Sequence, residues 1–191
     1  MHATSHIQDR YLQAEKQHKK KMTTEEIIEN ITSRDTHKVW KSACEIINNS
    51  QSSEILKPLI SYLPLIKKKT IDLKMGGAFA SNQRFIDFAI TTLEFHKDRK
   101  ECSCSLYTEK FKITNDIVDR KVRYEMFNPH NEVEKGNISI LGIERIEEKW
   151  IDYYKVQCLK CTTKYKVEER EGHYKFWYWE KLIKKPAGNN V

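Results

Sequence analysis

Two hydrophobic periodicities divide the chain near residue 100. Before this point, apolar residues recur every three or four positions, the spacing that gathers them on one face of an α-helix. After it, apolar and polar residues alternate, as they do in strands that bury one face of a sheet. Helical patterns followed by strand patterns predict an α+β fold, in which an N-terminal helical bundle packs on a C-terminal antiparallel sheet.

The helices of the first part carry recognisable start signals. Thr23 and Glu26 have the spacing of a capping box, and Ser33 or Asp35 is expected to cap the following helix. Ser81 is expected to cap the last helix, which is apolar around most of its circumference and should therefore be buried centrally.

Prolines interrupt the helical stretch that begins at Ser53. Pro58 and Pro64 remove backbone donors, so we expect them to kink or shorten this helix. Short helices in pairs, with small residues in the first and leucines in the second, resemble HEAT-like repeats over residues 24–97. A plain helical bundle with the same periodicity is the alternative.

The strand patterns predict a series of hairpins. The alternating runs lie at Phe111 and Ile113, Val122 to Met126, Ile138 to Ile143, Tyr154 to Cys158, Tyr165 and Val167, and Tyr174 to Trp179. Gly142 interrupts one run and is expected to mark a β-bulge. Turn residues between the runs favour an antiparallel sheet with one buried face.

Four of the five cysteines form two tight pairs, Cys102-x-Cys104 and Cys158-x-x-Cys161. Each pair fits one tight turn, and four thiolates suit the tetrahedral preference of Zn²⁺. We therefore predict that these four residues bind a structural zinc ion at the base of a zinc-ribbon-like unit.

Other roles for these thiols remain open at this point. Two disulfides need an oxidising compartment, but the sequence shows no apolar signal segment or membrane span, so a cytoplasmic protein is expected. A redox pair or uncoordinated buried thiols are the remaining alternatives. His96 lies near Cys102 and is either a substitute ligand or a helix cap, whereas Cys44 shares an apolar helix face and is expected in the core.

The charge distribution is uneven. The chain of 191 residues has a formal charge of +7, whereas the span from Glu109 to Glu180 is neutral. The excess therefore lies in the N-terminal half and in Lys181, Lys184 and Lys185. A basic surface attracts nucleic acid or an acidic protein, but it also simply keeps a protein soluble.

The segment His173 to Trp179 is the most aromatic of the chain. Either one row of rings is exposed and stacks on bases or a protein partner, or Trp177 and Trp179 pack on the helices and join the two parts. Glu168 and Glu169 are adjacent carboxylates on the preceding run, but no motif supplies a nucleophile with its base. We therefore expect no enzymatic activity.

The Cys158-x-x-Cys161 pair, the Val-Glu-Glu-Arg strand at 167–170 and the His-Tyr-x-x-Trp-x-Trp segment at 173–179 together resemble bacterial immunity proteins of polymorphic and contact-dependent growth-inhibition toxin systems. The resemblance implies a cytoplasmic protein, monomeric or in a 1:1 complex, that binds a cognate toxin domain and blocks its active site. Immunity proteins against nucleases are often acidic, whereas this chain is basic. It therefore needs either a toxin with an acidic surface or a local acidic patch of its own. The candidate patches are Glu144, Glu147, Glu148 and Asp152, or Glu168, Glu169 and Glu171.

These observations divide the chain into a mobile basic lead-in (1–22), a helical part (23–100), a zinc-ribbon-like sheet (101–183) and a disordered tail (184–191). The predicted partner contacts are Glu168, Glu169, Glu171, Tyr174 and Trp177.

Two other functions are kept as hypotheses. One is a nucleic-acid-binding zinc ribbon, and the other is an enzyme with a catalytic metal, which needs an open coordination position. The nucleic-acid hypothesis predicts one face that combines exposed aromatic residues with Lys19 to Lys21, Lys67 to Lys69, or Lys97, Arg99 and Lys100.

Overall fold

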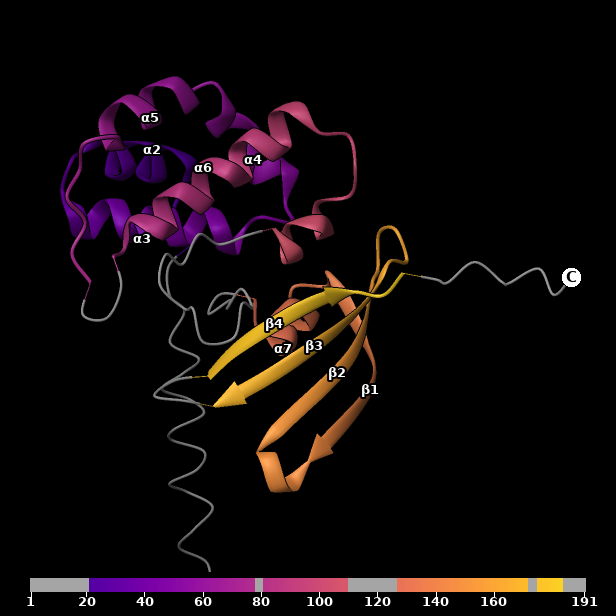
Figure 1. The fold of residues 1–191 in the computed structure, drawn as a ribbon. Helices are drawn as coiled ribbons and strands as arrows, with labels where there is room; N and C mark the ends of the chain where they lie inside the picture. The colour runs from indigo at the N-terminus through magenta and orange to yellow at the C-terminus, as the bar shows by residue number, and fades with distance from the viewer. Residues whose placement is uncertain (1–20, 78–80, 110–126, 172–174, 184–191) are drawn as a thin grey trace, which may run out of the picture.

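The expected α+β fold is confirmed in a computed structural model that describes residues 21–77, 81–109, 127–171 and 175–183 (Figure 1). The helices are α2 (Thr24–Thr32), α3 (Thr36–Asn48), α4 (Ser53–Ile60), α5 (Leu63–Thr70), α6 (Gln83–Asp98) and α7 (Pro129–Glu134), with the 3₁₀-helices η1 (Ser103–Thr108) and η2 (Glu147–Lys149). The strands are β1 (Ile138–Ile146), β2 (Ile151–Cys158), β3 (Lys164–Glu171) and β4 (Lys175–Lys181). The predicted runs at 111–113 and 122–126, the lead-in up to residue 20 and the tail lie outside the described residues.

The helix start signals work largely as the sequence predicts. The Thr23 hydroxyl accepts from the Glu26 amide, and the Glu26 carboxylate accepts from the Thr23 amide, which completes the capping box. Asp35, rather than Ser33, caps α3 by accepting from the amides of His37 and Lys38. The hydroxyl of Ser81 accepts from the Gln83 amide, although α6 begins after Asn82.

The proline-containing stretch folds as two helices. α4 ends at Ile60 with Pro58 inside it, and α5 begins at Leu63 with Pro64 in its first turn. A proline in the first turn removes a donor that would have no helical partner, so the chain breaks between the two prolines.

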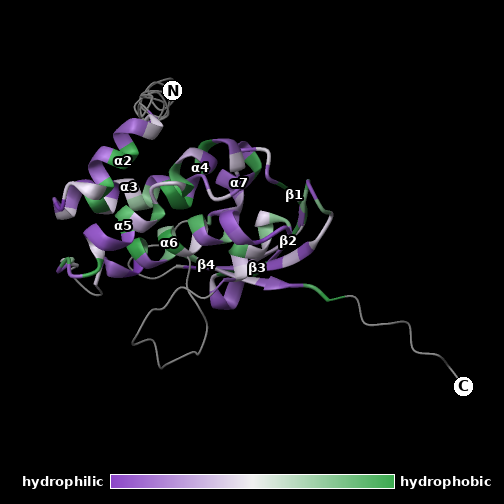
Figure 2. Ribbon diagram, turned by 90° about the horizontal axis from the view of Figure 1, so that it is seen from above, coloured by the Kyte–Doolittle hydropathy of each residue, from purple (hydrophilic) through white to green (hydrophobic). Residues whose placement is uncertain are grey.

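The helices form a compact bundle around α6, which contacts α3, α4 and α5. Figure 2 shows apolar and polar residues on the same helices, as expected for helices that each bury one face. No helix in the described part of the chain is both long and apolar enough to cross a membrane.

The sheet is an antiparallel meander in the order β1-β2-β3-β4. The register of β1 against β2 shifts between Ile140 and Gly142, which confirms the predicted bulge. The hairpin of β1 and β2 points away from the helices, whereas the turn between β2 and β3 lies beside η1 (Figure 1).

One apolar cluster within the described residues extends through both parts of the chain. Trp179 stacks on Tyr107 of η1 at 4.3 Å between ring centroids, Tyr107 contacts Phe127, and Phe127 contacts Phe88 of α6. The indole N–H of Trp179 also donates to the Phe127 carbonyl oxygen at 2.9 Å. Trp179 therefore joins the sheet to the helices, which was one of the two roles considered for the aromatic segment.

Candidate metal centre

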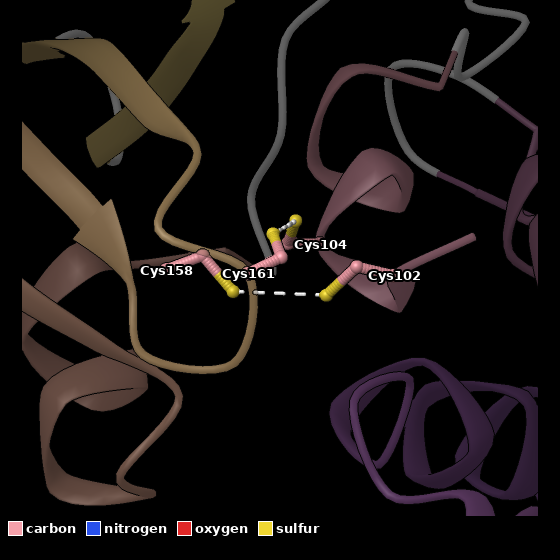
Figure 3. Close-up of side chains that lie close together, drawn as sticks. All are labelled: Cys102, Cys104, Cys158 and Cys161. Atoms are coloured by element: carbon pink, nitrogen blue, oxygen red, sulfur yellow. Dashed lines mark hydrogen bonds between the residues drawn. The ribbon is translucent and has the colours of Figure 1, made fainter.

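Four sulfur atoms converge where the helices meet the sheet (Figure 3). The Sγ atoms of Cys102, Cys104, Cys158 and Cys161 all lie within 4.8 Å of one another. Cys102 and Cys158 are 3.7 Å apart, and Cys104 and Cys161 are 3.3 Å apart. All four thiols are free. The predicted quartet is therefore brought together, close enough to bind a metal ion.

The first cysteine pair begins a 3₁₀-helix. Cys102 precedes η1 in an extended conformation, and its carbonyl oxygen accepts from the Ser105 amide and hydroxyl, which fixes the turn. Cys104 lies buried in that turn, where the Tyr165 hydroxyl is 3.1 Å from its carbonyl oxygen and 3.2 Å from its sulfur. A helical turn, and not a hairpin of the sheet, thus supplies this half of the site. In this respect the site differs from the zinc-ribbon-like unit that the sequence predicted.

The second pair lies on the turn between β2 and β3. The Cys158 amide donates to the Thr163 carbonyl oxygen, and the Thr162 amide donates to the Cys158 carbonyl oxygen. Thr162 has a positive φ of 60°, so the chain reverses directly after Cys161. The reversal lets Cys161 and Cys158 point toward the same centre.

A glutamine that the sequence did not single out connects both turns to the helices. Gln51 lies buried between α3 and α4; its amide nitrogen donates to the Ser103 carbonyl oxygen and its amide oxygen accepts from the Ser103 hydroxyl, both at 2.9 Å. Its own carbonyl oxygen accepts from Lys160 Nζ at 2.6 Å. Gln51 thus touches the residue between the first two cysteines and a residue between the last two.

Three of the four thiols have shifted pKa values. Burial raises the pKa of Cys102 and Cys104 above the ordinary thiol value. Burial also opposes ionisation of Cys161, but hydrogen bonds from the side chain and backbone of Thr163 outweigh it and lower its pKa to about 6. A bound cation favours thiolates at all four positions, and Cys161 is better prepared for it than Cys102 and Cys104.

The alternatives for the other two candidate residues are resolved. His96 Nε2 lies 2.7 Å from the Ser50 carbonyl oxygen and is not part of the sulfur cluster. Cys44 packs against the hydrophobic core on α3, as predicted from its helix face.

Three of the five predicted partner contacts lie where a partner has little access. Glu168, Glu169 and Trp177 are buried, with exposed fractions of 8%, 7% and 6%. Tyr174 lies outside the described residues, and only the backbone of Glu171, in β3, is described. A contact role for the five residues stays a prediction, and the burial of Glu168, Glu169 and Trp177 does not support it for these three.

Glu169 is an internal anchor of the sheet. Its carboxylate pairs with Lys175 at 2.7 Å and accepts from the Trp177 indole at 2.8 Å and from the Tyr154 hydroxyl at 3.2 Å. Burial raises its pKa, but the three donors outweigh burial and hold the pKa below the ordinary value. Glu169 is buried because it shares the inner face of the sheet with Val167.

A second buried carboxylate was missed by sequence reasoning. Glu132 on α7 is almost fully buried and accepts from Tyr107, Lys135 and Asn137 at 2.5–2.8 Å. The Lys135 ammonium also donates to the Asn48 carbonyl oxygen at 3.0 Å. Burial, followed by the Glu132 charge, raises the pKa of Tyr107 far above its usual range. This network joins η1 and α7 to the residue that precedes β1.

The basic clusters of the nucleic-acid hypothesis are partly neutralised. Lys67 pairs with Glu94, Lys97 with Asp98, and Arg99 with both Glu101 and Glu109. They lie on α5 and at the end of α6. The stretch from Lys19 to Lys21 lies almost entirely outside the described residues.

Comparisons of the chain with protein-family models, with curated proteins and with solved structures found no match. The function of this protein therefore has to be inferred from its own residues.

Proposed function

We propose that this chain is a zinc-stabilised immunity protein that binds a cognate bacterial toxin domain in the cytoplasm and blocks it stoichiometrically. The observation that carries the proposal is the closed sulfur quartet at the junction of helices and sheet. A site of this kind fixes the shape of a scaffold, which is what a binding protein needs. The resemblance of residues 158–179 to immunity proteins supplies the class of partner.

Zinc suits the quartet best among the common metals. With Zn–S bonds of about 2.3 Å, the edges of a sulfur tetrahedron are about 3.8 Å long. The measured separations of 3.3 and 3.7 Å, within an overall spread of 4.8 Å, lie around that value. Four soft ligands also disfavour magnesium and calcium, which prefer oxygen.

The same quartet argues against a catalytic metal. Catalytic zinc sites keep one position open for water or substrate, whereas four thiolates fill the tetrahedron. Among the described residues, the buried carboxylates Glu132 and Glu169 have their oxygen atoms committed to neighbouring donors, and the third, Glu168, is paired with Arg170. None of the three is therefore available as a general base.

The β1–β2 hairpin is the surface that we assign to the toxin. Trp150 at its tip is 75% exposed, and Ile143 and Leu141 on β1 are 58% and 48% exposed. Trp150 also has a φ of 52°, which costs about 1 kcal/mol or more for a bulky residue. An exposed tryptophan in a strained conformation gains little within the free protein, so its contribution is expected in a complex.

Charge around the tip suits a basic partner. Glu144, Glu147, Glu148 and Asp152 lie along the hairpin; Arg145 and Lys149 oppose them near the tip, and Lys155 lies farther along β2. Arg145 already contacts Glu147 and Asp152 at 3.2 and 3.7 Å. The hairpin thus carries local negative charge on a basic chain, and this charge would steer a basic toxin domain toward Trp150.

Coexpression of the chain with the toxin domain encoded beside it tests the proposal. We expect growth to be restored and a 1:1 complex to be recovered. Trp150→Ala should weaken the complex roughly 30-fold or more, as for an aromatic interface anchor, and the pair Glu147→Lys and Glu148→Lys should slow association. Binding is measured by titration calorimetry and stopped-flow fluorescence.

Matched variants on other surfaces serve as controls. Tyr62→Ala removes another exposed aromatic ring, and the pair Glu29→Lys and Glu134→Lys makes the same charge change away from the hairpin. Both should bind as the unchanged protein does. If no neighbouring toxin domain is neutralised or bound, the immunity function is rejected; if controls and hairpin variants weaken binding alike, the hairpin is not the docking surface.

A further inference from the structure

The outer face of the sheet, opposite the core, carries a basic groove that the proposed function leaves unexplained. A shallow groove of ≈ 890 Å³ begins at the turn that bears Cys161 and is lined by Lys155 and Lys164 of this face. Lys181 lines its margin at the end of β4, where it is the strand partner of the inward-facing Tyr165. A second hollow of ≈ 430 Å³ adds Lys166. Both share Lys155 and Leu182, so they form one track across the face.

These four lysines differ from the basic residues of the helical part. Lys155, Lys164, Lys166 and Lys181 are all exposed, and none forms an ion pair with a carboxylate in the described part of the structure. Glu144 lines the far end of the smaller hollow, and Glu180 lies opposite Lys166 in the strand register. The track therefore keeps a net positive charge.

The position of two of these lysines costs stability. Lys155 on β2 and Lys166 on β3 are direct cross-strand partners, and like charges placed opposite each other destabilise a sheet. Lys166 Nζ lies 4.0 Å from the centre of the Tyr153 ring, which offsets part of this repulsion. An anion placed between the two ammonium groups would remove the rest.

The lysines could balance the negative charge of a zinc-bound sulfur quartet, but this accounts for only part of their positive charge. Four thiolates around Zn²⁺ carry a net charge of −2, and Lys164 lies near them on the turn side of the groove. Lys155 is three residues from Cys158, about 10 Å along the strand, where screening by salt is already strong. We therefore expect a separate anionic ligand at Lys155 and Lys166.

We propose that this track binds the phosphate backbone of a single-stranded nucleic acid. The lysines are spaced about 5 Å apart across neighbouring strands and about 7 Å along one strand, which gives an extended polyanion several contacts at once. Tyr153 and the exposed Leu182 and Ile183 beside them offer apolar contacts for sugars and bases.

An acidic peptide fits this surface less well. Peptides that bind sheets usually gain main-chain hydrogen bonds at an edge strand. Lys155, Lys164 and Lys166 lie on β2 and β3, whose backbones are already paired on both sides, and the groove meets the edge strand β4 only at its end, at Lys181. A ligand here must be held by side chains alone, and phosphate groups with lysines achieve this.

Fluorescence anisotropy with the full chain, purified without chelator, tests the inference. The probe is a labelled oligothymidylate of about 12 nucleotides. With three or four phosphates neutralised, log K should fall with log salt at a slope of about −2 to −3, so affinity should drop roughly 20- to 50-fold between about 50 and 200 mM salt. The variant Lys155→Gln with Lys166→Gln should bind roughly tenfold more weakly and with a shallower slope.

The control variant Lys41→Gln with Lys57→Gln removes the same charge from the helical part and should bind as the unchanged protein does. Equal weakening in both variants would show general charge attraction and overturn the assignment. So would failure to bind at low salt, or tighter binding of a polyglutamate peptide of similar length. The variant Glu147→Lys with Glu148→Lys should keep oligonucleotide binding, which separates this inference from the toxin-binding proposal.

Discussion

At the scale of residues, buried polar side chains matter more for the stability of the fold than exposed charges do. Glu169 and Glu132 each collect three donors in the interior, and Gln51 makes two hydrogen bonds to Ser103. A buried group of this kind is costly when one partner is removed, because the remaining atoms lose both protein and water contacts. Single substitutions should therefore have measurable and specific effects.

The replacement Glu169→Gln should lower the free energy of unfolding by about 1–3 kcal/mol at neutral pH, because hydrogen bonds to a charged group are lost. The folded-state pKa of Glu169 lies below the ordinary value, so its contribution is present above the unfolded pKa and is lost as pH falls through the folded pKa. The difference between the two proteins should therefore shrink below about pH 4.5. Urea titrations at matched pH measure it, and a pH-independent difference would contradict this role.

At the scale of elements, two short turns that are far apart in the sequence are held by one helix–helix connection. η1 carries Cys104, and the β2–β3 turn carries Cys161. Gln51, between α3 and α4, forms hydrogen bonds with the residues that precede these cysteines, Ser103 and Lys160. Residues that orient metal ligands in this way usually tune the affinity of the site. The connection makes the metal site sensitive to a residue that coordinates nothing.

We expect Gln51→Ala to weaken metal binding by roughly 10- to 100-fold without removing a ligand. Competition with a coloured chelator gives the affinity. Gln83→Ala, which removes a glutamine bonded to Asp87 on the surface of α6, is the matched control and should leave it unchanged. An unchanged affinity in Gln51→Ala would mean that Gln51 supports only the helices.

At the scale of the whole molecule, helices and sheet are joined by two means. Apolar contacts run from Phe88 through Phe127 and Tyr107 to Trp179, and the sulfur quartet lies at the same junction. One shared core favours a single unfolding transition. A metal at the junction should strengthen this cooperativity, because its ligands come from both sides.

Metal removal should therefore separate the two parts. We expect one metal ion per chain by elemental analysis, and chelation should lower the melting temperature by roughly 10 °C or more. Hydrogen exchange should then become faster in β3 than in α6. Cys104→Ser should reproduce the effect, whereas Cys44→Ser should retain the metal; a metal-free protein with unchanged melting would refute a structural site.

Features that depend on near neighbours along the chain could be predicted from the amino-acid sequence. Helix periodicity, the capping box at Thr23, the bulge at Gly142 and the two cysteine pairs follow from residues within a few positions of one another. These local rules also placed Cys44 in the core and made the four cysteines the candidate site. Their convergence, however, was an expectation from ligand chemistry and needed the fold to bring the two turns within 4.8 Å.

Only the tertiary structure decided which polar residues are buried and which basic residues have acidic neighbours. Glu169 and Trp177 looked available on an alternating strand, but both lie on the inner face of the sheet. Gln51 was overlooked because Ser103 is 52 residues away in sequence. Burial and charge pairing depend on such distant contacts, whereas periodicity and capping do not, because a helix turn or a strand is specified within a few residues.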